Sequence, residues 1–242
     1  MGTRNLTVVI KDNEIKVAQY CQWDGYPDGQ GAEIVEFLQE RYDAEEFAAQ
    51  LDKYAKFLTQ EQIHDLWKNC GANDSGFVSI EVSNKFKERY PSLHRDTGAE
   101  ILDLIRIADD IVPLYNDAEF AKDGLFCEWT YVIDLDNEML EVYGGYNGEE
   151  YPAGSLFATD ILKANTCNGI WDINNIPSKE KFVAMLTEAG QPSADEAWAV
   201  LMHLRAKSGE MFDTDENVEM VEHICNYIEA NMDDFIEAIS DN

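Results

Sequence analysis

The chain has 242 residues, enough for one large domain or two modest ones, and its 45% hydrophobic content suffices for a full core. Lysine and arginine number 18 against 48 aspartates and glutamates, so the formal net charge is −30. Such a charge opposes contact with a phosphate backbone, which argues against a conventional DNA- or RNA-binding protein. The acidity fits solubility through self-repulsion, salt adaptation, or an acidic face that attracts a basic partner.

The cysteines are scattered and odd in number, and no two of them form a CxxC pair. This pattern is typical of free thiols in a reducing compartment. No apolar run resembles a signal peptide, and none approaches the ~20 residues that span a bilayer. We therefore expect a cytoplasmic protein that does not enter a membrane. The five cysteines are Cys21, Cys70, Cys127, Cys167 and Cys225.

The first elements expected are two strands within residues 5–20, joined by a turn at "KDNE". The stretch "QYCQWDGYPDGQG" (19–31) follows as a corner between strand and helix. Residues 33–57 then predict two short helices, each with one apolar stripe. The stripes are Ile34, Phe37 and Leu38, and then Phe47, Leu51, Tyr54 and Phe57.

The middle of the chain is expected to be mostly helical. Thr59 stands three residues before Gln62, a capping-box pattern that predicts a helix start. Residues 77–91 predict a short extended piece and a helix that Pro91 stops. Residues 96–111 predict a further helix, with its core-facing side chains at Ile101, Leu104, Ile105 and Ile107.

A second β region is predicted over residues 127–143, and it resembles the first. Both contain "VI", "DNE" and a later "YP", so they are interpreted either as a genuine repeat or as hairpins of similar geometry. Either way, they predict one antiparallel sheet assembled from distant segments. The last third predicts helices over residues 177–190, 192–207 and 213–240, the last with a sustained apolar seam.

These elements predict an α+β fold, in which an antiparallel sheet from two distant hairpins is covered by helices. We expect residues 1–175 to form the core domain. Residues 176–242 are expected to form an acidic helical region packed on that domain.

The corner at residues 19–31 is the first candidate site. Its three glycines resemble a phosphate cradle, but Asp24 and Asp28 lie in it and no lysine or arginine occurs between Lys16 and Arg41. A rigid double turn fits better. Trp23 and Tyr26 then either pack on the sheet or act as aromatic anchors for a partner.

The sequence offers little for a metal or cofactor. Residues 71–82 have the shape of a calcium loop, but Gly71 and Val82 stand where the strongest carboxylate ligands belong. The histidines do not form HxH or HExxH spacings with one another. Familiar nucleophile and nucleotide motifs are also missing. We expect no metal and no cofactor.

One enzymatic interpretation stays open. An early hairpin followed by helices is reminiscent of the layering in N-terminal-nucleophile hydrolases. Removal of Met1 would expose Gly2, which has no nucleophile, and Thr3 would require a further cut. An amidohydrolase-like enzyme with a site near residues 23–31 is therefore the alternative to a binding protein.

Three stretches together resemble a group of proteins encoded by bacteria and their phages: "GTRNLT", "VAQYCQWDGYPDGQG" and "CEWTYVIDLD". The resemblance covers roughly residues 2–180. The resemblance implies no particular activity for this chain. It implies a bacterial or phage cytoplasmic origin, and for a small acidic phage protein it favours an inhibitor of a host defence complex.

The leading prediction is a non-catalytic acidic protein that engages a basic surface of a host protein, as an anti-defence inhibitor or nucleic-acid mimic. A pocket protein that sequesters a small signalling molecule is a further alternative. No direct nucleic-acid or membrane partner is expected, and the oligomeric state is left open. The predicted contact residues are Trp23, Asp24, Tyr26, Asp28, Asp213, Asp215, Glu219, Glu222, Asp233, Asp234 and Glu237.

Overall fold

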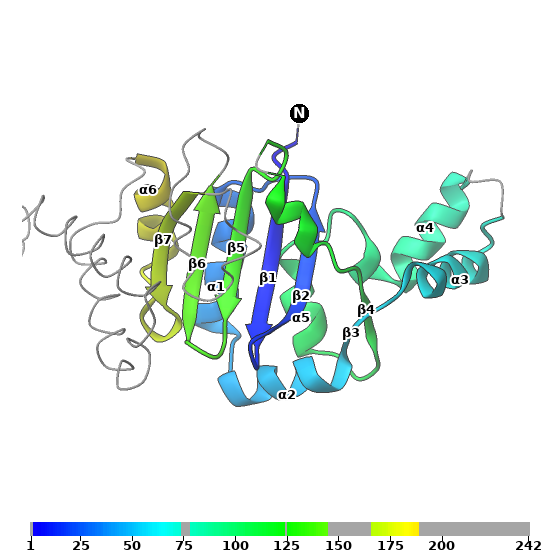
Figure 1. Ribbon diagram of the computed structural model, residues 1–242, viewed down its shortest axis with the longest axis horizontal. Coiled ribbons are helices and arrows are strands. Elements are labelled where there is room, and N and C mark those ends of the chain that lie inside the picture. The colour runs from blue at the N-terminus through cyan, green and yellow to red at the C-terminus, as the bar shows by residue number, and fades with distance from the viewer. Residues whose placement is uncertain (1, 74–77, 124, 145–165, 189–242) are drawn as a thin grey trace, which may run out of the picture.

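A five-stranded sheet forms the centre of the protein. The computed structural model describes residues 2–73, 78–123, 125–144 and 166–188. The strand order is β2-β1-β5-β6-β7, and a second sheet pairs the short strands β3 and β4 (Figure 1). The α+β class predicted from the sequence is confirmed. The strands are β1 (Asn5–Lys11), β2 (Glu14–Cys21), β3 (Ala55–Phe57), β4 (Val112–Leu114), β5 (Trp129–Asp134), β6 (Met139–Gly144) and β7 (Thr166–Asp172).

Both predicted hairpins are present. Strands β1 and β2 pair antiparallel around Asp12 and Asn13, which both have φ of +56°. Two consecutive residues with positive φ give the turn the twist that matches a tight hairpin, and Asp and Asn tolerate this conformation better than most residues. Strands β5 and β6 form the second antiparallel hairpin.

The two hairpins meet through a parallel pair, so the sheet is mixed rather than purely antiparallel. Val8 lies opposite Val132 in the pairing of β1 with β5. Parallel neighbours need a long crossover, and residues 22–128 supply it before the chain re-enters the sheet beside β1. The pairing also brings the "DNE" segments at 12–14 and 136–138 to neighbouring turns.

Helices cover one face of the sheet. Val9, Tyr131 and Val142 point to this face and pack in one cluster with Ile34 and Ile105 of the helices. The amphipathic stripes predicted from the sequence supply most of the helical contribution to this core. The helices are α1 (Ala32–Glu40), α2 (Ala44–Tyr54), α5 (Glu100–Arg106) and α6 (Lys179–Glu188).

A smaller apolar cluster covers the opposite face. Leu6, Val8 and Ile10 alternate with the core-facing residues of β1 and pack with Val132 and Ala121. Ala121 belongs to a short 3₁₀ turn, η3 (Ala118–Lys122), which packs over β1 and β2. Burial on both faces explains why β1 reads as an almost continuous apolar run.

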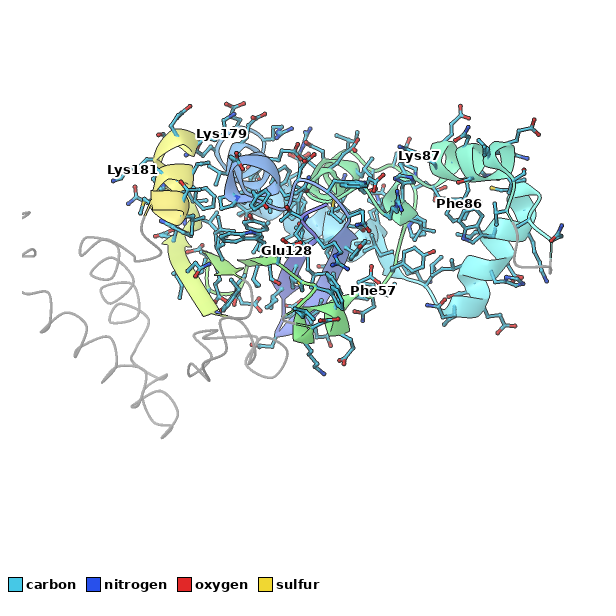
Figure 2. All side chains as sticks on the ribbon, turned by 90° about the horizontal axis from the view of Figure 1, so that it is seen from above. Phe57, Phe86, Lys87, Glu128, Lys179 and Lys181 are labelled. Carbon is cyan, nitrogen blue, oxygen red and sulfur yellow. The ribbon has the colours of Figure 1, made fainter. Side chains whose placement is uncertain are left out.

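Helices α3 (Gln60–Cys70) and α4 (Ile80–Arg89) extend away from the β2 edge of the sheet (Figure 1). Both halves of the predicted capping box at Thr59 and Gln62 are formed. The pair has its own small core, in which Phe86 stacks on Trp67. Figure 2 labels Phe86 on α4. The chain leaves α4 at Pro91 through a 3₁₀ turn, η2 (Pro91–Leu93).

Some sequence predictions need correction. Phe57 does not continue the stripe of α2, because the helix ends at Tyr54 and Phe57 belongs to β3. Ile107 is not a core residue: α5 ends at Arg106 and the Ile107 side chain is 64% exposed. Strand β7 was not predicted from the sequence. A 3₁₀ turn, η4 (Ile173–Asn175), follows it. The helices predicted over 192–207 and 213–240 lie outside the described residues.

Within the described ranges, no helix combines the length and apolarity needed to cross a bilayer.

Candidate binding site

The corner between β2 and α1 is a rigid loop with an unusual backbone. Asp24 has φ of +56°, and a short π-helical turn, η1 (Pro27–Gly31), leads directly into α1. Pro27 occupies the first position of η1, where its fixed φ costs no hydrogen bond. A side chain at Gly29 would collide with the Asp24 carbonyl. The double turn expected from the sequence takes the form of a bend at Gln22 and Trp23 followed by the π-helical turn η1.

Hydrogen bonds hold the loop to the segment before β1 and to the sheet. The Gly25 amide donates to the Thr3 carbonyl at 3.0 Å. The Gln30 amide donates to the Asp24 carbonyl at 2.8 Å. From the sheet, the buried Tyr131 hydroxyl donates to the Gly25 carbonyl at 2.9 Å. These bonds leave the loop backbone few ways to move, because buried polar groups lose a partner if it shifts.

A second segment, residues 95–99, braces the loop from the side. The Gln22 amide donates to the Arg95 carbonyl at 3.0 Å, and the Ala99 amide donates to Gln30 Oε1 at 2.6 Å. Gly98, with φ of +50°, lies so close that a Cβ there would fall on the Gln30 carboxamide. Gln30 itself is buried, so this contact belongs to the core of the corner.

The loop exposes four side chains and buries the residues between them. Trp23, Asp24, Tyr26 and Asp28 are exposed, whereas Gly25, Pro27 and Gln30 are buried. The aromatic side chains are 44% and 53% exposed respectively. These four are the loop residues that the sequence singled out as contacts. The structure brings them together on one short segment, with the aromatics partly in solvent rather than buried in the sheet.

Carboxylates surround this loop. Desolvation raises the pKa of Glu33, and the neighbouring charges of Glu100, Glu36 and Asp24 raise it further. A carboxyl group whose pKa responds to three other carboxylates reports a locally negative potential. The remaining predicted contacts, Asp213, Asp215, Glu219, Glu222, Asp233, Asp234 and Glu237, lie outside the described residues.

Two buried thiols, Cys21 beside the loop and Cys127 on the opposite face of the sheet, are unsuited to nucleophilic catalysis. Cys21 Sγ donates to the Trp23 carbonyl at 3.3 Å, and burial raises the pKa of this thiol. Burial also raises the pKa of Cys127 to about 11. Because the thiolate is the reactive form, both groups are protonated and unreactive near neutral pH.

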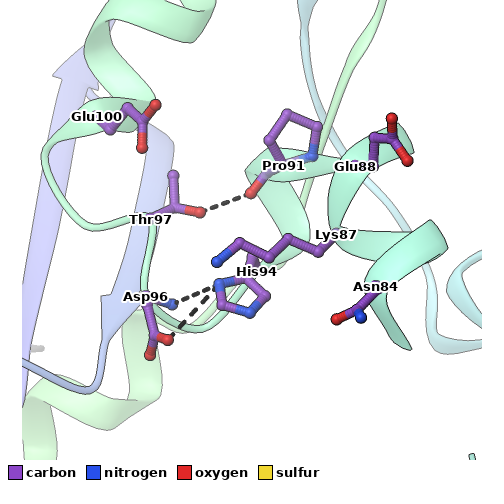
Figure 3. A pocket seen from close by; sticks show the side chains of 8 residues that line it. All are labelled: Asn84, Lys87, Glu88, Pro91, His94, Asp96, Thr97 and Glu100. Carbon is purple, nitrogen blue, oxygen red and sulfur yellow. Dashed lines mark hydrogen bonds and ion pairs between the residues drawn. The ribbon is translucent and has the colours of Figure 1, made fainter. Parts of the chain in front are cut away.

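A polar hollow lies next to the bracing segment, between α4 and residues 91–100. It has a volume of about 430 Å³, and Figure 3 shows the side chains that line it. His94 Nδ1 accepts a hydrogen bond from the Asp96 amide, and burial lowers the pKa of His94. The Thr97 hydroxyl donates to the Pro91 carbonyl at 2.6 Å instead of to His94. Thr97 and His94 are therefore not arranged as a nucleophile and its base.

The calcium-like loop of residues 71–82 is described only in part. Among the described residues, no three His, Cys, Asp or Glu side chains gather closely enough to hold an ion. Gly71, at the start of the calcium-like loop, has φ of +106° and ends α3 as a left-handed cap. Residues 74–77 of that loop lie outside the described part of the chain.

A second hollow, of about 580 Å³, lies between the α3–α4 pair and strand β2, and His94 borders both. Its polar lining includes Gln19 and Asp117, which the sequence analysis missed. Gln19 alternates with apolar neighbours on an amphipathic strand, and nothing in its sequence context separates it from a solvent-facing glutamine. The hollow is assembled from segments about a hundred positions apart, which strand periodicity cannot bring together.

Comparison of the chain with family models, curated proteins and solved structures found no match.

Proposed function

We propose that this protein is a non-catalytic binding protein that engages a basic surface of a partner protein through the loop at residues 22–31. The observation that carries the proposal is the pattern of exposure on this loop. Two aromatics and two carboxylates project from a backbone that is otherwise buried and hydrogen-bonded.

Rigid aromatic anchors bind well for a physical reason. Trp and Tyr are enriched among the residues that dominate interface energies. A loop that is already ordered loses little conformational freedom on binding, so more of the contact energy appears as affinity. Trp23 and Tyr26 meet both conditions, because buried contacts fix the backbone beside them.

The charge of the loop selects the kind of partner. Asp24 and Asp28 flank the aromatics, and the formal net charge of the chain is −30. Complementary potentials raise the rate of encounter and disfavour acidic partners. A partner with lysines or arginines around an apolar depression would satisfy both parts of the loop.

The bacterial or phage setting, the cytoplasmic location and the role as an anti-defence inhibitor rest on the sequence and its resemblance, and they stay predictions. The amidohydrolase alternative is less well supported. The thiol nearest the loop, Cys21, is buried with a raised pKa. Neither hollow described above includes Asp24 in its lining.

The test is affinity capture from a bacterial lysate at low and at high salt, followed by measurement of the captured protein's affinity. Trp23→Ala/Tyr26→Ala should weaken binding by roughly 1,000-fold, because two anchors of ~2 kcal/mol each supply ~4 kcal/mol together. Asp24→Asn/Asp28→Asn should slow association and reduce its salt dependence. Asn tolerates the positive φ at position 24, so this variant leaves the loop conformation intact.

Ile80→Ala is the matched control, because Ile80 is an exposed apolar side chain (80%) on α4, an element separate from the loop. Circular dichroism of each variant checks the fold. Capture of the same proteins by the wild type and the double aromatic variant would contradict the proposal, as would the absence of any captured protein at either salt.

A further inference from the structure

Two neighbouring large apolar side chains are exposed on a second segment, the turn at residues 123–128. Leu125 is 74% exposed and Phe126 is 44% exposed. Single exposed apolar residues are common on protein surfaces, whereas contiguous exposed apolar patches mark interaction sites. Cys127, the next residue along the chain, is buried in the smaller apolar cluster of the sheet. The turn therefore anchors itself through one residue and presents the two before it to solvent.

Hydrogen bonds fix the shape of this turn. The Asp123 carbonyl accepts from the Phe126 amide at 3.0 Å and from the Cys127 amide at 2.7 Å. The turn is also joined to the segment before β1, because the Glu128 amide donates to the Arg4 carbonyl at 3.0 Å and the Arg4 amide donates to Glu128 Oε1 at 3.2 Å. A segment held in this way loses little conformational freedom when a partner binds.

The turn lies at the same end of the sheet as the loop at residues 22–31. Asn5 pairs with Cys21 at the end of β2 and with Trp129 at the start of β5. These pairings bring both segments beside residues 2–4, at the end of the sheet where the chain begins (Figure 1). The Gly25 amide of the loop and the Glu128 amide of the turn both donate to carbonyls of residues 2–4.

Exposed rings from both segments contact residues 2–4. A Cβ at Gly2 would collide with the Trp23 ring, so this ring lies directly against the Gly2 backbone. The Arg4 guanidinium carbon lies 4.4 Å from the centroid of the Phe126 ring. Cα atoms two positions apart are at most ~7 Å apart, and a typical interface covers ~800 Å² of each partner. Trp23, Leu125 and Phe126 therefore fit within the area of one interface.

The charges around these rings favour a cationic partner. Asp24, Asp28 and Asp123 are exposed. Arg4 is the single lysine or arginine in residues 2–4, 22–31 and 123–128, and its guanidinium already lies over the Phe126 ring. This end of the sheet therefore combines apolar side chains with an excess of negative charge, which attracts cationic groups and disfavours anionic ones.

We propose that the turn at residues 123–128 forms one docking surface with the loop at residues 22–31, and that its occupant is an apolar segment of a partner protein flanked by lysines or arginines. The apolar segment packs on Trp23, Leu125 and Phe126, and its cations pair with the carboxylates around them. This inference rests on the proposed function, since it gives the same partner a second contact and specifies the chemistry of that partner.

The experiment measures binding of the full chain to a labelled amphipathic peptide of leucine and lysine, by fluorescence anisotropy at physiological ionic strength. Leu125→Ser/Phe126→Ser should weaken binding at least about tenfold, because it removes the apolar contact of the turn. Trp23→Ala/Tyr26→Ala should weaken it at least about tenfold as well. A peptide with serine in place of leucine keeps the charge but not the apolar side chains, and it should bind more weakly than the original.

Val78→Ser/Ile80→Ser is the matched control. These side chains are 44% and 80% exposed, close to the values for Phe126 and Leu125, and they lie beside the first turn of α4 instead of at this end of the sheet. None of the substitutions changes the charge of the chain, so a general attraction of the peptide to an acidic protein is the same in every variant. The control variant should bind as the wild type does. Circular dichroism of each variant checks the fold.

Unchanged affinity in Leu125→Ser/Phe126→Ser, with a loss in Trp23→Ala/Tyr26→Ala, would overturn this inference and leave the proposed function standing. Loss of affinity in the turn variant alone would support the turn as a contact and contradict the proposed function of the loop. Equal losses in the turn variant and the control would overturn the inference, as would equal binding of the leucine and serine peptides.

Two other occupants are tested with the same turn variant. Binding of the chain to phosphatidylcholine vesicles, weakened by Leu125→Ser/Phe126→Ser, would assign the surface to a membrane and overturn the inference. Sedimentation of the chain alone tests a second copy. A concentration-dependent dimer that the same substitutions dissociate would overturn the inference too.

Discussion

Single residues decide how firmly the candidate loop is held. Gly98 and Gln30 are 68 positions apart, yet the Gln30 carboxamide accepts from the amide next to Gly98. Gly98 has a positive φ and no room for a side chain. Gly71 also has a positive φ, but a Cβ there would meet only the Val82 side chain at ordinary contact distance. Both glycines therefore need a positive φ, but only Gly98 is packed too closely to accept a side chain.

Gly98→Ala should destabilise the protein more than Gly71→Ala. Both place a Cβ on a left-handed backbone, which costs about 1–2 kcal/mol. At position 98 the side chain also displaces Gln30, so the loss of that buried hydrogen bond adds about 1–3 kcal/mol. Urea unfolding measures both changes. Equal destabilisation would show that the contact between Gly98 and Gln30 contributes nothing.

At the scale of elements, the two hairpins are aligned by one carboxylate. Asp136, in the turn of the second hairpin, accepts from the amides of Asp12 and Asn13 at 2.8 and 2.7 Å. The Leu135 amide donates to the Ile10 carbonyl at 3.0 Å, which extends the hydrogen bonds between β1 and β5 up to the two turns. Strand register is fixed over six consecutive pairs of β1 with β5, from Asn5↔Trp129 to Ile10↔Asp134.

Asp136→Ala should lower the free energy of unfolding by about 1–2 kcal/mol, because two charge-assisted hydrogen bonds at an exposed site are lost. Asp136→Asn should cost less, since an amide oxygen still accepts one of the two bonds. Chemical denaturation of both variants tests the order. A larger loss for Asn than for Ala would show that the carboxylate does not align the turns.

At the scale of the whole molecule, charge governs stability. The formal charge of −30 creates repulsion that the compact state feels more strongly than the unfolded chain. Buried carboxyl groups act in the same direction. Burial raises the pKa of Asp134 and of Asp117 above the ordinary value of 3.8, so their native forms hold a proton more tightly than the unfolded chain does. Their contribution is present at low pH and is lost as pH rises through the native pKa.

The unfolding temperature should therefore rise as pH falls from neutral toward the ordinary carboxyl value of 3.8, and added salt should raise it more at neutral pH. His94 opposes this trend, because its lowered pKa removes stability as pH falls through its ordinary value of 6.5. Calorimetry at several pH values measures the sum. Asp134→Asn should flatten the lower part of the profile. An unfolding temperature that falls with decreasing pH over this range would show that repulsion and burial are not dominant.

Local patterns in the sequence were enough to place most elements and the candidate loop. Alternating apolar residues around "KDNE" determined the first hairpin, and the Thr59–Gln62 pair determined where α3 begins. The four loop residues stood out because aromatics, acids, proline and glycines rarely share so short a stretch. These signals are local, because the propensities of neighbouring residues and the residues that form turns are enough to produce them.

Only the tertiary structure decided how distant segments combine. The parallel contact of β1 with β5 depends on a crossover of roughly a hundred residues, and β7 joins the sheet through pairing with β6 rather than through a pattern of its own. The hollow beside β2 likewise exists because Gln19, Trp67 and Asp117 converge from three separate segments. Sequence determined which side chains this protein could use. Packing determined that Trp23 and Tyr26 stay exposed while the Gln19 acceptor is buried.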